Sequence, residues 1–163
     1  MKSSQVTNVV IAGLGGQGVL RASDILADVA FAAGQDVKKS EVHGMSQRGG
    51  SVASDVRFGE HVYSPMVPEG EADYLVVVSS DQVPVNRHLL KNLGTLLEPA
   101  QFNLEGLRNK KSVNVALLGA LSRHLGFSAE AWIEAIRRNF PETLLQTNLD
   151  AFRIGSRTKS SPE

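Results

Sequence analysis

The start of the chain combines a short apolar strand with a glycine-rich turn and a helix. Residues 6–12, V-T-N-V-V-I-A, are rich in β-branched side chains and lead directly into G-L-G-G-Q-G at residues 13–18. Apolar residues then recur at helical spacing through residues 17–33, and Gly34 is well placed to end that helix. A second short strand is expected at residues 35–40. This order predicts a parallel β-α-β unit with a right-handed crossover.

The middle of the chain predicts further strands. Residues 51–58 alternate between apolar and polar, and Gly59-Glu60 would turn them back into a partner strand at residues 61–64, forming an antiparallel hairpin. Residues 74–78, Y-L-V-V-V, predict a buried central strand. A helix at residues 82–92 and a brief strand at residues 95–97 would follow.

The C-terminal part predicts helices. Ser112 and Ser128 each precede a helical pattern and are typical capping residues, and Pro141 would open a last helix that ends at Gly155. We therefore expect an α/β fold: a doubly wound, mostly parallel sheet with an antiparallel hairpin and a helical C-terminal part. Residues 1–155 would form a single domain, and residues 156–163 a disordered tail.

Composition excludes several classes of protein. The chain has 163 residues, with 17 Lys and Arg against 17 Asp and Glu, so its formal net charge is zero and does not favour binding to nucleic acid. No apolar run reaches the length of a membrane span, and residues 1–8 lack the apolar core of a signal peptide, so we expect a cytoplasmic protein that binds no membrane.

The absence of cysteine limits the chemistry of the chain itself. Without cysteine there is no thiolate nucleophile and no thiolate ligand for zinc or an iron–sulfur cluster. The four histidines do not show metal-ligand spacing. We therefore expect no metal site on this chain, and any redox chemistry would need a bound organic cofactor or another chain.

The glycine loop is a candidate anion site. Gly13, Gly15 and Gly18 follow a strand and precede a helix, and the residues between them include Gly16 and Gln17. This is the setting of the dinucleotide fingerprint, in which backbone N–H groups approach an anion. Under a nicotinamide interpretation Glu41 would bind the ribose, or Lys38 and Lys39 a 2′-phosphate. Alternatively, the glycines only let the first helix pack closely against the sheet.

A second cluster mixes glycines with polar side chains. Residues 40–50 read S-E-V-H-G-M-S-Q-R-G-G, and apolar runs flank this segment on both sides. Its candidate functional residues are Glu41, His43, Ser46, Gln47, Arg48, Gly49 and Gly50. A loop without a task rarely needs so many donors, acceptors and glycines, so we interpret it as a contact surface for a ligand or a partner.

Several ordered motifs carry a resemblance to a known family. Residues 13–27, 40–59 and 64–73, and later V-N-V-A-L-L-G-A-L at 113–121 and N-L-D-A-F at 148–152, resemble the gamma subunits of the 2-oxoacid:ferredoxin oxidoreductases. Within this family the resemblance is strongest to the beta-subunit type of the indolepyruvate enzymes. It covers most of residues 6–155.

The resemblance implies a part of an enzyme. In that family a thiamine diphosphate- and magnesium-binding subunit decarboxylates the 2-oxoacid, iron–sulfur clusters pass the electrons to ferredoxin, and coenzyme A takes up the acyl group. The chain would thus bind no cofactor alone. It would contribute the coenzyme A side of the site and the interface with the subunit that holds thiamine and the clusters, and would meet ferredoxin only indirectly.

The family suggests roles for individual residues. Residues 13–18 would lie beside the coenzyme A phosphates, and His43, Gln47 and Arg48 would face the acyl-transfer channel or the partner chain. Alternatively, Glu41 pairs with Arg48 and merely orders the loop. Arg57 and Asp73 also match the family, and for both we favour a structural role.

This chain departs from the family at residues 98–111, which are short and poor in strand-forming residues. A missing sheet edge would expose apolar surface and allow a homodimer. Two further readings of the function stay open: a free-standing NAD(P)- or flavin-binding oxidoreductase, and a scaffold protein that has lost its ligand site.

Overall fold

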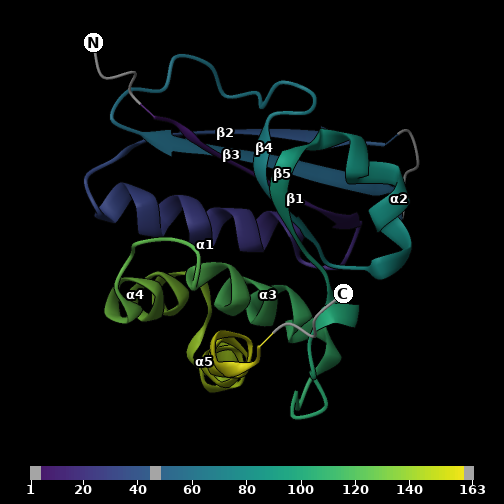
Figure 1. Cartoon of the computed structure of the whole chain (residues 1–163). Helices are drawn as coiled ribbons and strands as arrows, with labels where there is room; N and C mark the ends of the chain where they lie inside the picture. The colour runs from purple at the N-terminus through teal and green to yellow at the C-terminus, as the bar shows by residue number, and fades with distance from the viewer. Residues whose placement is uncertain (1–4, 45–48, 160–163) are drawn as a thin grey trace.

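The computed structural model describes residues 5–44 and 49–159 of the chain. Within these residues the chain forms a five-stranded open sheet with helices below it (Figure 1). The strands are β1 (Thr7–Leu14), β2 (Asp36–His43), β3 (Ser51–Gly59), β4 (Ala72–Val77) and β5 (Leu90–Leu97). The α-helices are α1 (Val19–Ala32), α2 (Val83–Asn86), α3 (Val113–Ser122), α4 (Ala129–Asn139) and α5 (Glu142–Arg157). Single turns of 3-10 helix occupy η1 (Ser80–Gln82), η2 (Arg87–Leu89), η3 (Pro99–Gln101) and η4 (Lys110–Ser112).

Strand β1 lies at the centre of the sheet, whose strand order is β2-β3-β1-β4-β5. It pairs with β4 in parallel and with β3 in antiparallel orientation, and β3 pairs antiparallel with β2. The predicted β1-α1-β2 unit is therefore parallel, but β3 lies between its two strands. The α/β class, the open sheet and the helical C-terminal part are confirmed. The mostly parallel sheet is confirmed as well, since β1, β2, β4 and β5 run in one direction and β3 opposes them, so that its two pairings are the antiparallel ones.

The antiparallel hairpin exists, but with a different partner. Residues 61–64 form no strand. Both edges of β3 are already occupied, since Thr7 of β1 and Val37 of β2 are both paired with Phe58. A further strand beside β3 has no free backbone groups to pair with. The observed hairpin consists of β2 and β3 instead.

The helix expected at residues 82–92 is also wrong. This stretch divides into η1, the four-residue α2 and η2, and the chain enters β5 at Leu90. Pro84 lies in the first turn of α2, where its missing N–H is tolerated. Leu90 pairs with Ala72 of β4, so the sheet takes the residues that would have extended the helix.

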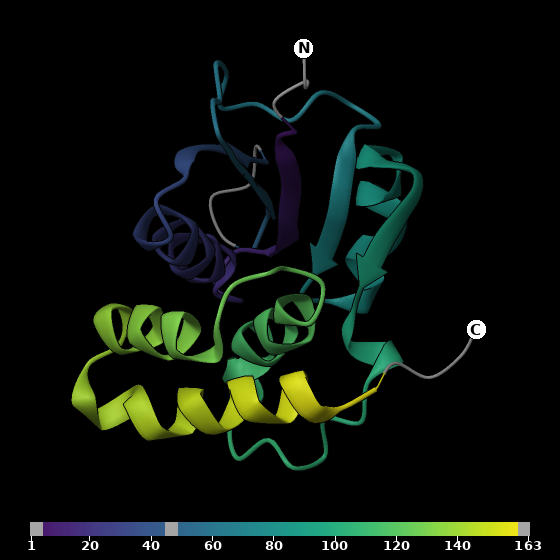
Figure 2. The same ribbon diagram turned by 60° about the vertical axis from the view of Figure 1, so that its left-hand side comes forward.

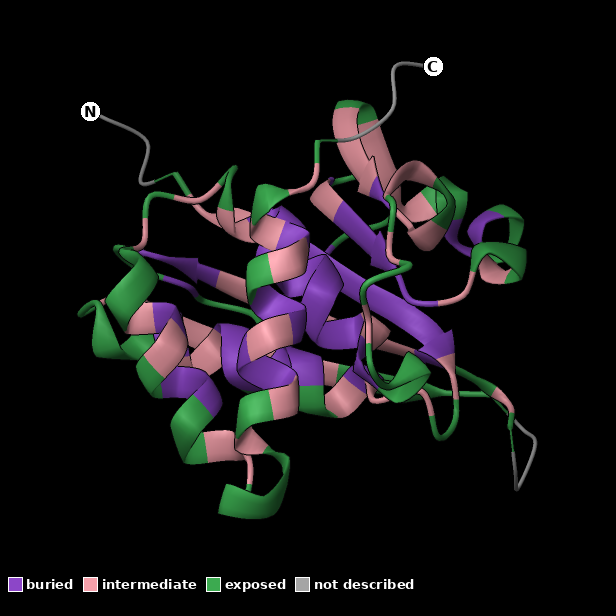
Figure 3. Cartoon of the chain, turned by 90° about the horizontal axis from the view of Figure 1, so that it is seen from below, coloured by how far each residue is buried: buried purple, intermediate pink, exposed green. Residues whose placement is uncertain are grey.

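Helices α1, α3, α4 and α5 are layered on one face of the sheet, as Figures 1 and 2 show. Helix α1 lies against β1, β2 and β3, α3 and α4 pack against α1, and α5 packs against α3 and α4. The opposite face carries only a small apolar cluster that includes Val10, Leu75 and Val83 of α2. The fold is thus doubly wound only in part, since α2 and the segment between β3 and β4 cover this second face. Figure 3 shows the buried strand segments at the centre and exposed residues on the outer turns of the helices.

Several predicted element ends agree with the structure. Gly34, with φ +83°, follows α1, and the Ser128 hydroxyl accepts the N–H of Ala131 at 3.1 Å as the cap of α4. Ser112 precedes α3 but makes no capping hydrogen bond and is buried instead. Helix α5 continues to Arg157, so the first two residues of the expected tail are helical. Every helix among the described residues is too short or too polar to span a lipid bilayer.

Helices α3 and α5 approach each other closely because glycine lies at their contact. A Cβ atom at Gly155 would overlap the carbonyl oxygen of Ala116, and one at Gly119 would overlap that of Phe152. Two backbones at this separation leave no room for a side chain between them. The position of α5, which also brings Phe152 onto Trp132 at 5.6 Å between ring centroids, depends on these two glycines.

We predict that Gly155→Ala destabilises the protein by about 2–3 kcal/mol, as measured by urea unfolding, because an added methyl forces the helices apart. The change would otherwise favour the helix by up to about 1 kcal/mol. Gly126→Ala is the matched control, since nothing lies within 4 Å of its added methyl. Equal stabilities of the two variants would contradict the close packing of α3 and α5.

Strand β5 begins with an unusual turn. Ala72 pairs with Leu90 and Tyr74 with Thr95, so four residues of β5 stand opposite Asp73 alone. At the tip of this bulge Leu93 has φ +64°, and 95% of its surface is exposed. Leucine is strained in this left-handed region, and no burial of its side chain offsets the strain.

We predict that Leu93→Gly stabilises the protein by about 1 kcal/mol, because glycine adopts a positive φ without steric cost. Leu93→Ala removes the same exposed side chain but keeps the Cβ, so it should gain little. The two midpoints of urea unfolding separate these effects. A gain of the same size in both variants would show that backbone strain is not the cause.

Candidate functional site

The candidate site lies where β1 and β4 end. These two strands are parallel neighbours, and the chain leaves β1 for α1 on one face and β4 for α2 on the other. In open α/β sheets this divergence opens a crevice outside the carboxyl ends of the strands, where ligands bind. The glycine loop at residues 13–18 forms one wall of this crevice.

The glycine loop is held by its own glutamine. The Gln17 Oε1 atom accepts the N–H of Leu14 at 2.8 Å, and a Cβ at Gly13 would lie only 2.9 Å from the same oxygen. Gly16 and Gly18 have φ values of +87° and +78°, so the turn requires glycine-like conformations at both. The side-chain oxygen of Gln17 thus holds the loop in shape through a hydrogen bond inside the loop itself. That the side-chain N–H groups of Gln17 donate to a ligand stays a prediction.

A contact across 96 residues fixes the loop against the helical part of the chain. The Asn114 Nδ2 group donates to the Gly18 carbonyl oxygen at 3.0 Å, and a Cβ at Gly18 would collide with this amide. Asn114 is 4% exposed and lies in the first turn of α3. Helix α3 therefore begins directly beside the start of α1.

This contact brings two lysines to the crevice. Lys110 and Lys111 of η4 precede α3, and both line a cleft of about 220 Å³. The remaining lining residues of this cleft are Gly16, Gln17, Val78 and Val113. Two ammonium groups beside the free N–H groups at the start of α1 favour a phosphate or carboxylate group. The sequence analysis missed these lysines, although N-K-K-S directly before a helix was a visible signal.

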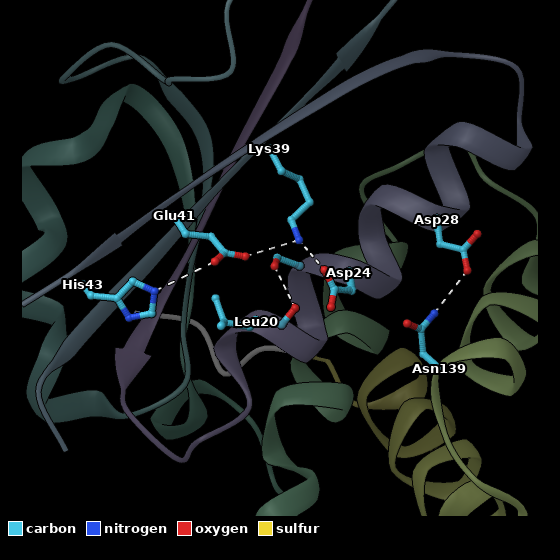
Figure 4. A network of polar contacts seen from close by, with 8 residues as sticks. Leu20, Asp24, Asp28, Lys39, Glu41, His43 and Asn139 are labelled. Carbon is cyan, nitrogen blue, oxygen red and sulfur yellow. Dashed lines mark hydrogen bonds and ion pairs between the residues drawn. The ribbon is translucent and has the colours of Figure 1, made fainter. Parts of the chain in front are cut away.

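A larger cleft of about 610 Å³ lies on the other side of the glycine loop. Gly15, Gly16, Gly18, Arg21, Asp24 and His43 line it, together with the apolar residues Leu14, Val19, Leu20 and Val52. Because alternate residues of a strand share a face, Lys39, Glu41 and His43 of β2 all point toward α1 (Figure 4). Glu41 lies 3.6 Å from the Lys39 Nζ atom and 3.9 Å from the His43 Nε2 atom, and Lys39 bonds Asp24.

The structure brings the two predicted motifs together. The Gly15 N–H donates to the Gly50 carbonyl oxygen at 2.8 Å. Gly49, with φ +66°, is the first described residue after position 44. Ser46, Gln47 and Arg48 lie outside the described residues, so their predicted contacts, including a pair between Glu41 and Arg48, stay predictions.

The geometry gives little support to a nicotinamide site. The neighbour of β1 on the β2 side is β3, which runs in the opposite direction and presents its amino end to the glycine loop. Glu41 therefore lies one strand too far away for the ribose of a nucleotide bound at this loop. Lys39, the candidate for a 2′-phosphate, is engaged with Asp24 and Glu41.

The described residues contain no group of three or more His, Asp or Glu side chains that could hold a metal ion, and the chain has no cysteine. What the crevice offers is a set of donors: lysine ammonium groups, the N–H groups of the glycine loop and the start of α1. Such a set binds and orients an anion. Among these described groups no activated nucleophile or paired acid and base stands out.

A curated relative is similar over most of its length. The chain is 38% identical to the "Indolepyruvate oxidoreductase subunit IorB" of Thermococcus kodakarensis, in a match that covers 91% of this chain and 93% of the relative. The match runs over 190 residues, more than the 163 of this chain, so it includes positions that this chain lacks.

Solved structures share the fold. The gamma subunit of a keto/oxoacid ferredoxin oxidoreductase from Geobacter sulfurreducens matches with a TM-score of 0.77 and 21% identity, over 96% of this chain and 100% of that one. The 2-oxoglutarate:ferredoxin oxidoreductase of Magnetococcus marinus, solved with 2-oxoglutarate, coenzyme A and succinyl-CoA bound, matches with a TM-score of 0.79 and 20% identity, over 94% of this chain and 31% of that one.

A family model matches the sequence as well. The family model for pyruvate ferredoxin/flavodoxin oxidoreductase matches residues 8–158, which is nearly the whole chain. The chain therefore belongs to the pyruvate ferredoxin/flavodoxin oxidoreductase family.

Proposed function

We propose that this chain is the accessory subunit of a thiamine diphosphate-dependent 2-oxoacid:ferredoxin oxidoreductase that converts indolepyruvate or another arylpyruvate to its acyl-CoA. The observation that carries the proposal is the 38% identity to an indolepyruvate oxidoreductase subunit over nearly the full length of both chains. The substrate assignment follows the name of that relative.

The division of labour within the complex follows from the chemistry of the residues. A chain without cysteine supplies no thiolates to an iron–sulfur cluster. The described residues likewise offer no acidic cluster for the magnesium ion of thiamine diphosphate. The proposal therefore assigns decarboxylation and electron transfer to ferredoxin to a partner subunit.

This chain would contribute the coenzyme A side of the site. The cleft lined by Lys110 and Lys111 fits a phosphate group in size and charge. The larger cleft continues past the glycine loop with both apolar and polar walls, which suits an extended ligand. The coenzyme A bound in the Magnetococcus marinus enzyme supports this assignment by analogy of fold. When bound, coenzyme A supplies the thiol that takes up the acyl group.

We predict that the purified chain alone does not oxidise arylpyruvates, and that activity appears when the thiamine- and cluster-bearing subunit is added. The measurement is coenzyme A-dependent reduction of ferredoxin with indolepyruvate. Pyruvate and 2-oxoglutarate serve as controls for the substrate class. Turnover by the isolated chain, or failure of the two subunits to associate, would refute the proposed function.

We predict that the double variant Lys110→Glu with Lys111→Glu raises the KM for coenzyme A about tenfold in the assembled enzyme, which corresponds to about 1.4 kcal/mol of lost binding. The KM for indolepyruvate should not change, because the proposal places the 2-oxoacid on the partner subunit. Lys159→Glu is the matched charge control, because Lys159 lines a different cleft, together with Leu97. An unchanged KM for coenzyme A in an intact complex would favour a scaffold role for this chain.

A further inference from the structure

The segment between β3 and β4 folds back over the second face of the sheet. It runs from Glu60 to Glu71 and crosses the top of the molecule in Figure 1. We refer to these twelve residues as the β3–β4 loop. Among them only Val62 and Val67 are buried, at 2% and 9% exposure. The two valines attach the loop to the body of the protein, and nearly all its other residues face solvent.

Polar side chains of the sheet hold the backbone of the β3–β4 loop. The N–H groups of Val62 and Val67 each donate to a carboxylate at 2.8 Å, that of Asp36 and that of Asp55 respectively. The Val62 N–H is the main reason why the pKa of Asp36 lies below its ordinary value. Each buried valine is therefore fixed by its side chain and by its own N–H group.

Arg57 of β3 fixes the part of the loop between the two valines. Its Nη1 atom donates to the carbonyl oxygens of Ser64 at 2.8 Å and Met66 at 3.3 Å. Its Nε atom donates to the Asn8 side chain at 2.8 Å, which holds the guanidinium against β1. These contacts agree with the structural role favoured for Arg57, and they determine the loop conformation before any partner binds.

This ordered loop presents its largest apolar side chains to solvent. Tyr63 is 89% exposed and Met66 is 57% exposed, and the ring of His61 stacks on Tyr63 at 6.4 Å between centroids. Tyrosine and methionine are enriched in protein interfaces, and a tyrosine often dominates the binding energy. Because the backbone is already ordered, binding through these side chains would cost little conformational entropy.

The charge of the β3–β4 loop restricts what can bind there. The loop contains Glu60, Glu69 and Glu71 but neither lysine nor arginine. Among the described residues, Glu69 and Glu71 make no ion pair, and Glu60 approaches only His61. A symmetric contact between two copies of this chain that is centred on this loop would place acid against acid. The surface therefore favours a different, basic partner.

We propose that the β3–β4 loop docks Tyr63 and Met66 into an apolar pocket rimmed by lysine and arginine side chains on the partner subunit of the complex. The identity of that partner rests on the proposed function, whereas the docking surface rests on the exposure, rigidity and charge of the loop. This surface lies on the face of the sheet opposite α1 and is distinct from the two clefts beside the glycine loop.

The test measures the affinity of the full-length chain for the thiamine- and cluster-bearing subunit. Tyr63→Ala should weaken the complex about 30-fold and Met66→Ala about tenfold, because hot-spot side chains at interfaces have effects of this size. Phe31→Ala is the matched control, since Phe31 is 73% exposed on α1. It should leave the affinity unchanged. Thermal melting of each variant, expected at the wild-type temperature, reports that the fold is intact.

Charge and salt provide a second readout. The double variant Glu69→Lys with Glu71→Lys should weaken the complex about tenfold at 50 mM NaCl. Raising the salt to 500 mM should reduce the difference in affinity between this variant and wild type, because salt screens the charges. If wild type binds the partner and Tyr63→Ala binds equally well, the docking proposal is overturned and the proposed function stands. If Tyr63→Ala instead disrupts a dimer of this chain, a second copy occupies the surface and the docking proposal is also wrong. Absence of any binding by wild type would overturn the proposed function itself.

Discussion

The backbone of Gly18 and the side chain of Asn114 meet where the strand-and-glycine half of the chain touches its helical half. The amide of Asn114 donates to the Gly18 carbonyl oxygen, and no side chain fits at position 18. This contact places the start of α3 beside the start of α1, and with it Lys110 and Lys111 beside the glycine loop. The positive charge of the crevice, which Lys110 and Lys111 supply, therefore depends on the uncharged hydrogen bond between Asn114 and Gly18. On the side of α3 that faces α5, the close contact at Gly119 and Gly155 also holds α3 in that position.

The two-residue period of β2 and β3 divides their polar side chains between two tasks. On one face Lys39, Glu41 and His43 point toward α1, and His43 lines the larger cleft. On the other face Asp36, Asp55 and Arg57 bind the backbone of the β3–β4 loop. Burial raises the pKa of Asp55, so the sheet retains this carboxyl group at a cost in solvation. Its hydrogen bond to Val67 explains why a charged group is kept there.

The elements that sequence predicted well are those specified by neighbouring residues. Strand β1, the glycine loop, α1 and the stop at Gly34 follow from local periodicity and from the freedom of glycine. The partner of β3 was mispredicted because pairing depends on which strand edges remain free, and both edges of β3 are filled by distant segments. Lys110 and Lys111 were missed for the same reason. Their place beside Gly16 is set by a contact between residues 96 positions apart.

The surfaces of this chain lie at different places on one rigid sheet, and this separation shapes how the subunit would act. The clefts gather where β1 and β4 end, whereas the β3–β4 loop begins at the opposite end of β1, since Thr7 pairs with Phe58. A partner that covers the loop need not cover the lysines. Binding energy can thus come from Tyr63 and Met66, while the crevice stays free to take an anionic ligand and release it. Under the proposed function, the subunit would contribute to turnover in this way, by holding ordered binding groups in place at little entropic cost.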